Sequence, residues 1–233
     1  TWHLDFMWAF DGIGHAPTNT GLPFHDETAK IDDTFLIGKV ELTKEHPFIE
    51  HFRYVQQFED ETTVAKLTIP APAQFIEQFI MPMNRDQTDK YYGNDQELLN
   101  DIVAGYGAFI EQAYAAGCRN LQLDDCSWGV LVDPRAELFF GADQEGLKKI
   151  KALLLEINNR VLDAAPSDLT INTHVCRGNF HSTWACEGGY DDVADVLLAQ
   201  EHVNAFFLEF DDHRSGGFEP LASVPAGKKV VLG

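Results

Sequence analysis

Short apolar segments alternate with longer amphipathic segments from residue 64 onward. The short segments are almost continuously apolar, which is typical of buried strands, and they cover residues 64–69, 120–124, 169–174, 205–209 and 229–232. The longer segments place apolar side chains three or four positions apart, which predicts helices over residues 95–117, 143–164 and 190–200. Each predicted strand is short and is followed by polar or ionisable residues.

Strands that alternate with helices imply right-handed βαβ crossovers and a parallel sheet. The chain contains neither a G-x-G-x-x-G nor a Walker sequence, which disfavours a nucleotide-binding open sheet. We therefore expect an α/β fold of the (β/α)8 TIM-barrel class, although only five of the eight strands that a closed barrel needs are evident. Pro70 and Pro72 are expected to end the first of these strands after Ile69.

The chain of 233 residues is expected to form a single domain. Residues 1–63 do not follow the alternation, and their Gly, Pro, His and Asp content predicts loops or a hairpin inserted before the βα repeats of residues 64–233. The first residue is Thr1 rather than Met, and the chain ends inside a predicted strand. We expect it to be an incomplete piece of a longer protein.

Charge and composition exclude several classes of function. Lys and Arg total 17 against 37 Asp and Glu, so the formal net charge is −20. Such a chain repels phosphate backbones and anionic lipids, which argues against nucleic-acid and membrane-surface binding. No apolar run approaches the ~20 residues of a membrane span. Four Cys are too few for a disulfide scaffold, so a reducing cytoplasmic location is expected.

The sequence Asn172-Thr-His-Val-Cys-Arg-Gly-Asn179 carries the most informative chemistry. Residues two apart on a strand point to the same side, so His174 and Cys176 are expected to face one point. An imidazole and a thiolate that converge at the C-terminal end of a strand form half of a zinc site. Either residue alone is more often a packed core side chain.

Glu209 ends the next predicted strand and would lie at the same edge of the sheet. A carboxylate is an acceptable third zinc ligand, but Glu209 could equally form an ion pair with Arg177 or Arg214. Asp124 closes the strand at residues 120–124, and alternation turns it toward the barrel interior together with Gln122. A buried carboxylate there needs a partner, either a substrate amino group or a neighbouring strand.

Three segments resemble the cobalamin-independent methionine synthase family, in its catalytic C-terminal barrel and in its short stand-alone members. They are Leu121-Gln-Leu-Asp-Asp125, Thr173-His-Val-Cys-Arg-Gly-Asn179 and Phe207-Leu-Glu-Phe-Asp211, which occur in the family's order at successive strand ends. The likeness covers most of the chain from Asp5 onward. It implies a zinc-dependent transfer of a methyl group from 5-methyltetrahydrofolate, with one or several glutamates, to the thiol of homocysteine, giving methionine.

The resemblance also implies roles for individual residues. His174, Cys176 and Glu209 would hold the zinc, and Asp124 would hold the amino group of homocysteine. Thr68-Ile-Pro-Ala-Pro72 is similar to the strand end that borders the folate donor, which implies that Pro70 and Pro72 contact it. The partners would therefore be small molecules. The resemblance does not single out a catalytic acid in this chain, and the sequence leaves the oligomeric state open.

The chain departs from the family pattern in three respects. The family's last zinc Cys would lie beyond Gly233 and its first barrel strand would precede Thr1, so the first and last strands of the barrel are expected to be absent. Cys186 is a conceivable but weak substitute for the missing ligand. Asp125 stands where members of the family carry Glu.

Other functions stay open at this point. A zinc-dependent alkyltransferase or lyase acting on another thiol, such as one that opens epoxides with coenzyme M, would share the same ligands. A barrel glycosidase would use Asp124 and Glu209 as acid and nucleophile and leave His174 and Cys176 idle. A metal-free descendant that only folds or binds is a further alternative.

Overall fold

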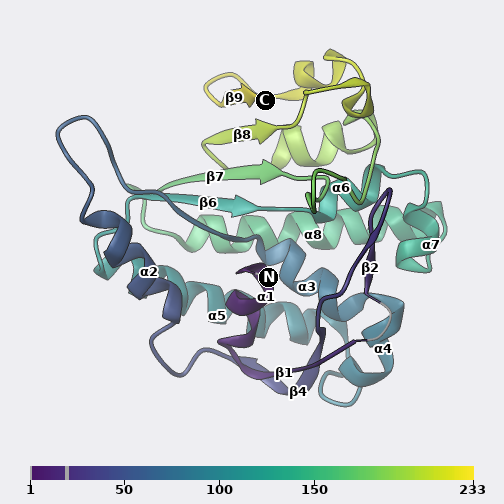
Figure 1. Ribbon diagram of the computed structural model, residues 1–233, viewed down its shortest axis with the longest axis horizontal. Helices are drawn as coiled ribbons and strands as arrows, with labels where there is room; N and C mark the ends of the chain where they lie inside the picture. The colour runs from purple at the N-terminus through teal and green to yellow at the C-terminus, as the bar shows by residue number, and fades with distance from the viewer. Residues whose placement is uncertain (1, 19–20) are drawn as a thin grey trace.

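The computed structural model describes residues 2–18 and 21–233 and contains a five-stranded parallel sheet (Figure 1). Residues 1, 19 and 20, which fall within the predicted N-terminal insertion, lie outside the described residues. The strands lie side by side in chain order, as β5 (Leu67–Pro70), β6 (Asn120–Asp124), β7 (Thr170–Val175), β8 (Ala205–Leu208) and β9 (Lys229–Leu232). The order never reverses, which is the arrangement of a barrel segment rather than of a doubly wound sheet.

Helices connect β5 to β6 and β6 to β7 and pack together against one face of the sheet. They include α3 (Pro72–Ile80), α5 (Asp95–Ala115) and α8 (Gln144–Ala164), with the short helices α4 (Pro82–Thr88), α6 (Ser127–Val132) and α7 (Ala136–Phe140) between them. Side-chain caps set the starts of the two longest helices. Asn94 accepts a hydrogen bond from Glu97 N, and Asp143 accepts one from Gly146 N.

Alternation along β6 separates an apolar face from a polar face. Leu121 and Leu123 of β6 are buried and belong to the core that also contains Leu154 of α8. Gln122 and Asp124, on the opposite side of the same strand, are only half-buried. The polar face therefore carries the side chains available for chemistry.

The first 63 residues contain the predicted hairpin and two helices that their composition did not predict. The hairpin joins β1 (Asp11–Ala16) to β4 (Asp33–Glu41), and a two-residue pair, β2 (Leu22–Pro23) and β3 (Thr28–Ala29), lies within its connection. The helices are α1 (Trp2–Trp8) and α2 (Pro47–Gln56). Each buries aromatic or aliphatic side chains in the same core cluster as the βα repeats.

Two local predictions are wrong. Pro70 is the last residue of β5 rather than the residue that follows the strand. It needs no N–H there, because β5 pairs only with β6 among the described residues, and the next hydrogen bond of the ladder runs from Ala71 N to Asp124 O, 2.8 Å. Residues 190–200 do not form an α-helix; a 3₁₀ turn, η1 (Asp191–Val193), leads into a π-helical turn, η2 (Ala194–Leu198).

The segment between β8 and β9 contains only two short 3₁₀ helices, η3 (His213–Ser215) and η4 (Glu219–Ser223). The prediction of an α/β fold with a parallel sheet is confirmed. The closure of this sheet into an eight-stranded barrel stays a prediction. In the part of the chain that the structure describes, no helix has both the length and the apolar character that crossing a membrane would require.

Candidate metal centre

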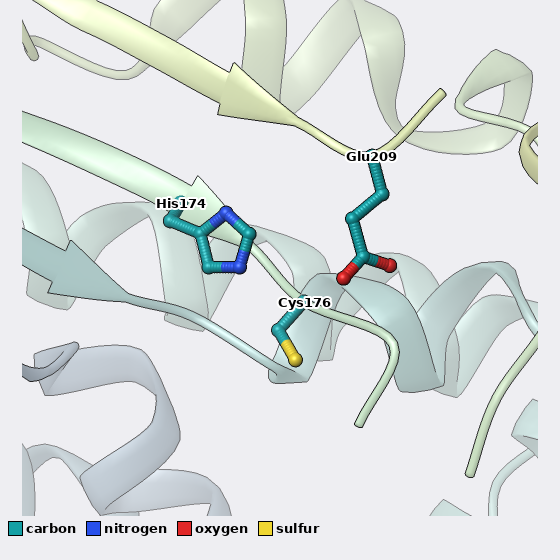
Figure 2. A group of neighbouring side chains, drawn as sticks. All are labelled: His174, Cys176 and Glu209. Atoms are coloured by element: carbon teal, nitrogen blue, oxygen red, sulfur yellow. The ribbon is translucent and has the colours of Figure 1, made fainter. Parts of the chain in front are cut away.

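Three of the side chains predicted to bind metal meet at the carboxyl ends of β7 and β8. One donor atom from each of His174, Cys176 and Glu209 lies within 4.8 Å of the other two. Figure 2 shows the imidazole on β7, the thiol in the loop that follows it and the carboxylate just after β8, all directed toward the same space. All three residues are half-buried.

The sheet register explains why these residues meet. Asp124, His174 and Phe207 are neighbours in one row across β6, β7 and β8. Adjacent strands lie ~4.8 Å apart, so the side chains of one row are close together. Cys176 and Glu209 each follow two positions later, and therefore lie on the same face one row nearer the sheet's edge.

The backbone of β8 fixes the orientation of the His174 ring. His174 Nδ1 lies 3.1 Å from the carbonyl oxygen of Phe207. A carbonyl oxygen can only accept, so Nδ1 carries a proton and donates it, which turns Nε2 toward Cys176 and Glu209. A hydrogen bond of this kind on the second ring nitrogen is usual for histidines that bind metals.

The environment of Cys176 favours the thiolate. A hydrogen bond from the Cys126 thiol is the largest influence, and together with His174 and the Gly178 N–H it lowers the pKa of Cys176 to about 5 despite burial. Gly178 N lies 3.0 Å from the sulfur. Burial alone would lower the pKa of His174, but its hydrogen bond to Cys176 and the charge of Asp124 outweigh burial and raise it.

The carboxylate of Glu209 lies between Arg177 and the other two residues of the donor-atom cluster. Burial, followed by the negative charge of Cys176, raises the pKa of its carboxyl group above the ordinary value. The guanidinium Nη1 of Arg177 lies 4.0 Å from Glu209 Oε2, which is the ion pair considered as an alternative role. Arg214 pairs with Asp211 and Asp212 instead. The ion pair and the cluster of donor atoms therefore occur together.

Asp124 lies beside this cluster, in the same row as His174. Gln122 Nε2 donates to Asp124 Oδ1 over 2.7 Å, and Lys66 Nζ donates to Gln122 Oε1 over 2.6 Å. Burial raises the pKa of Asp124. Pro70 and Pro72 are buried at the end of β5 and at the start of α3, and their predicted contact with a methyl donor stays a prediction.

The donor set fits zinc better than it fits a hard cation. Zinc accepts His nitrogen, Cys sulfur and carboxylate oxygen together, whereas Mg²⁺ and Ca²⁺ prefer oxygen alone. Zinc needs a thiolate and an imidazole with a free Nε2 lone pair, so binding would release the proton that His174 shares with Cys176. Among the residues that the structure describes, no group of donor atoms close enough to bind a metal includes Cys186.

Sequence reasoning missed two residues around this centre and a buried network behind the sheet. Cys126 hydrogen-bonds to Cys176, and its position directly after the strand end at Asp124-Asp125 was the available signal. Tyr190 contacts the backbone of Glu209, and no local pattern indicated it. Behind the sheet, a buried network joins Asp125, Asn158 and Glu201.

Comparisons with known proteins place the chain among bacterial relatives. No protein-family model matches it. It is 38% identical over 237 residues to the uncharacterized protein YxjH of Bacillus subtilis (strain 168) and 35% identical over 237 residues to the uncharacterized protein YxjG of the same strain. All of the chain is covered in both comparisons, and it spans 60% of the length of each relative.

Two solved structures extend the comparison to the fold. A protein from Listeria monocytogenes, provisionally assigned as a vitamin-B12 independent methionine synthase, matches with a TM-score of 0.71 and 27% identity, over 100% of this chain and 60% of that one. A B12-independent methionine synthase from Shewanella sp. W3-18-1, in complex with selenomethionine, matches with a TM-score of 0.58 and 16% identity, over 98% of this chain and 60% of that one. The second likeness concerns the fold alone.

Proposed function

The chain resembles the cobalamin-independent methionine synthase family in motifs and in fold, as its sequence predicted, and on this premise we propose that it is the catalytic part of a zinc-dependent methyltransferase. The proposed reaction moves the methyl group of 5-methyltetrahydrofolate, in a polyglutamated form, to the thiol of homocysteine and gives methionine. The observation that carries the proposal is the convergence of His174, Cys176 and Glu209 at the carboxyl ends of adjacent strands.

These three side chains would hold the zinc at the edge of a parallel sheet where barrel enzymes carry out their chemistry. When bound, zinc supplies a Lewis acid that keeps a substrate thiol ionised at neutral pH. The protein contributes orientation: Phe207 O holds the His174 ring, and Gly178 N holds the Cys176 sulfur. Positioning matters because an in-line methyl transfer depends mainly on the alignment of its reactants.

Asp124 would bind the amino group of homocysteine. Its carboxylate lies beside the metal ligands, and the hydrogen bond from Gln122 turns it in a fixed direction. A cationic amino group beside Asp124 would offset the burial that raises the pKa of this carboxyl group. The end of β5, with Pro70 and Pro72, is where we place the methyl donor.

The full-length protein is expected to form methionine from homocysteine and 5-methyltetrahydropteroyltriglutamate, and to lose this activity when a chelator removes its zinc. Added Zn²⁺ should restore the rate, because the thiol is otherwise mostly protonated at neutral pH. Methionine is quantified by mass spectrometry before chelation, after chelation and after readdition. If the protein alkylates a different thiol and not homocysteine, the proposed acceptor is wrong. If it hydrolyses sugars and a chelator does not inhibit this activity, it is a glycosidase and the proposed function is wrong.

Substituting Asp124→Asn is expected to raise KM for homocysteine about 10- to 100-fold, since a hydrogen bond to a charged group contributes ~1.5–3 kcal/mol. The zinc content should not change, because Asp124 is not in the group of donor atoms. The control substrate is 4-mercaptobutanoate, which has the thiol but no amino group and should react equally with both proteins. Equal losses for the two thiols, or loss of zinc, would exclude amino-group recognition by Asp124.

A further inference from the structure

Tyr190 is a fully buried tyrosine beside the metal centre, just before η1. The guanidinium of Arg177 lies over its ring, 4.5 Å from the ring centre, and the ring of Phe210 packs against it at 5.2 Å. Arg177 and Phe210 are the residues that directly follow Cys176 and Glu209 in the sequence. The tyrosine therefore contacts both segments that carry the metal ligands.

The hydroxyl group of Tyr190 uses its whole hydrogen-bonding capacity on these two segments. It accepts from Arg177 Nη1 at 2.9 Å and from the backbone N–H of Glu209 at 3.1 Å, and it donates to the carbonyl oxygen of Glu209 at 3.4 Å. A phenol has one proton to donate and can accept two, so no capacity remains. Both backbone groups of Glu209 bind this single oxygen.

The sheet explains why Glu209 needs such a partner. β8 ends at Leu208 and β7 ends at Val175, so Glu209 lies beyond the paired part of the two strands. On the β9 side, Gly233 bonds to the residues before and after Glu209, with Gly233 N to Leu208 O at 3.2 Å and Phe210 N to Gly233 O at 3.1 Å. The N–H and C=O of Glu209 itself point the other way, toward the side of β7, whose pairing with β8 ends at Val175. The Tyr190 hydroxyl therefore supplies the hydrogen bonds that a longer β7 would give to the backbone of Glu209.

Arg177 connects the same hydroxyl to the loop after β7. Its guanidinium also donates to the carbonyl oxygen of Gly188, and its Nη1 lies 4.0 Å from Glu209 Oε2. The Arg177 side chain is 1% exposed, so its geometry is set by these contacts rather than by solvent. The loop with Cys176 and the strand end with Glu209 are thus held at a fixed separation through Tyr190.

We propose that Tyr190 is a positioning residue of the metal centre, which fixes the backbone of Glu209 so that its carboxylate meets His174 and Cys176. The inference rests on the proposed function, because it assigns Glu209 as a metal ligand. The hydroxyl of Tyr190 bonds to the backbone of Glu209 and to Arg177, so it acts on the metal ligands through the residues that carry or follow them.

The test measures the zinc dissociation constant of the full-length protein by competition with a chromophoric chelator. Tyr190→Phe keeps the ring but leaves the N–H of Glu209 without its acceptor, and zinc affinity should fall at least about 10-fold, as for other residues that orient metal ligands. In a Glu209→Gln background the same substitution should have no further effect. This non-additivity is the signature of action through Glu209.

Tyr92→Phe is the matched control. Tyr92 is also buried. Its hydroxyl accepts from the backbone N–H of Val40 at 2.7 Å and donates to Asp101 Oδ2 at 2.9 Å, away from the metal centre. The zinc affinity of the Tyr92→Phe protein should equal that of the wild type. If Tyr190→Phe does not fold, as judged by thermal unfolding, Arg177→Lys tests the same connection with a smaller expected loss.

Two results would overturn the inference. Tyr190→Phe could bind zinc as tightly as the wild type, or it could weaken binding by the same factor whether or not Glu209 is present, which would indicate a general structural role. Failure of the proposed function would look different. In that case Glu209→Gln alone would leave the zinc dissociation constant of the wild-type protein unchanged, or the wild type would bind no zinc.

Discussion

Replacing Cys176 with alanine is expected to abolish zinc binding and methyl transfer in the full-length protein. Cys176 provides the one sulfur in the described cluster of donor atoms, and its pKa of about 5 means that it is already a thiolate at neutral pH. Residues that merely orient ligands cost ~10–100-fold in metal affinity when they are replaced, so loss of a ligand should cost more than 100-fold. Metal analysis of the purified variant, together with methionine formation, measures the effect.

Cys118→Ala is the control for this substitution. Cys118 is a fully buried thiol whose Sγ contacts the carbonyl oxygen of Asn120 at 3.4 Å, at the N-terminal end of β6 and therefore at the opposite end of the sheet from the metal centre. This variant should keep one zinc per chain and its activity. If the Cys176→Ala protein still holds one zinc, Cys176 is not a zinc ligand and the proposed metal centre is wrong. A function that does not use this thiol would then be favoured.

The sequence predicts this centre well because each step depends on local geometry. Alternation places His174 and Cys176 on one side of a strand, and a parallel sheet brings the end of the next strand, with Glu209, to the same edge. The structure agrees on both points. Alternation also separates Asp124 from Asp125: Asp124 lies beside His174, whereas Asp125 is buried on the helix side.

Contacts between side chains and distant backbone could not be predicted in this way. The hydroxyl of Tyr190 reaches the backbone of a residue 19 positions away, and this depends on how the loop after β7 folds back. The path of that loop is set by contacts such as those of Ala185 N and Cys186 N with Arg177 O. Nothing in the spacing of polar residues indicates such a path.

In the fold, too, the sequence predicts where buried segments lie better than it predicts their hydrogen-bond pattern. The predicted strands at 120–124 and 229–232 have the bounds of β6 and β9. In β6, Leu121 and Leu123 are buried and alternate with polar residues, which is the two-residue period of a strand that is buried on one side. The error at residues 190–200 has a simple cause. Apolar spacing shows that Val193, Leu197 and Leu198 are buried on one side, but it does not distinguish an α-helical from a 3₁₀ or π-helical hydrogen-bond pattern.

Behind the sheet, a network of buried carboxyl groups has no counterpart in the sequence reasoning. Asn158 of α8 donates to Asp125 Oδ2 at 2.9 Å and to Glu201 Oε1 at 2.6 Å. Burial raises the pKa of Glu201 to about 8 and that of Asp125 to about 6, and Glu77 of α3, also buried, reaches about 8. In the part of the chain that the structure describes, Glu201 Oε2 is buried without a hydrogen-bond partner. Lys228 is the cation that faces Glu201, and it bonds to the backbone carbonyl of Glu201 rather than to its carboxylate.

Glu201 should therefore make the folded protein less stable as the pH rises. Its pKa is 4.5 in an unfolded chain and about 8 when folded, so between these values the folded state holds a proton that the unfolded state has lost. Below pH 4.5 Glu201 is protonated in both states and does not lower the free energy of unfolding. As the pH rises from 4.5 to about 8, the free energy of unfolding falls by about 1.4 kcal/mol for each pH unit. Above pH 8 the loss is complete, since both states are then ionised.

Glu201→Gln is expected to remove this dependence, because glutamine imitates the protonated acid and keeps the acceptor for Asn158. The free energy of unfolding of the variant, relative to wild type, should rise by roughly 2 kcal/mol between pH 6 and pH 8. Urea unfolding of the zinc-loaded full-length proteins at each pH gives this difference. Glu111→Gln, at an exposed position on α5, should follow the wild type throughout. A difference between Glu201→Gln and wild type that does not change with pH would mean that Glu201 is ionised in the folded protein, with water or Lys228 solvating its charge.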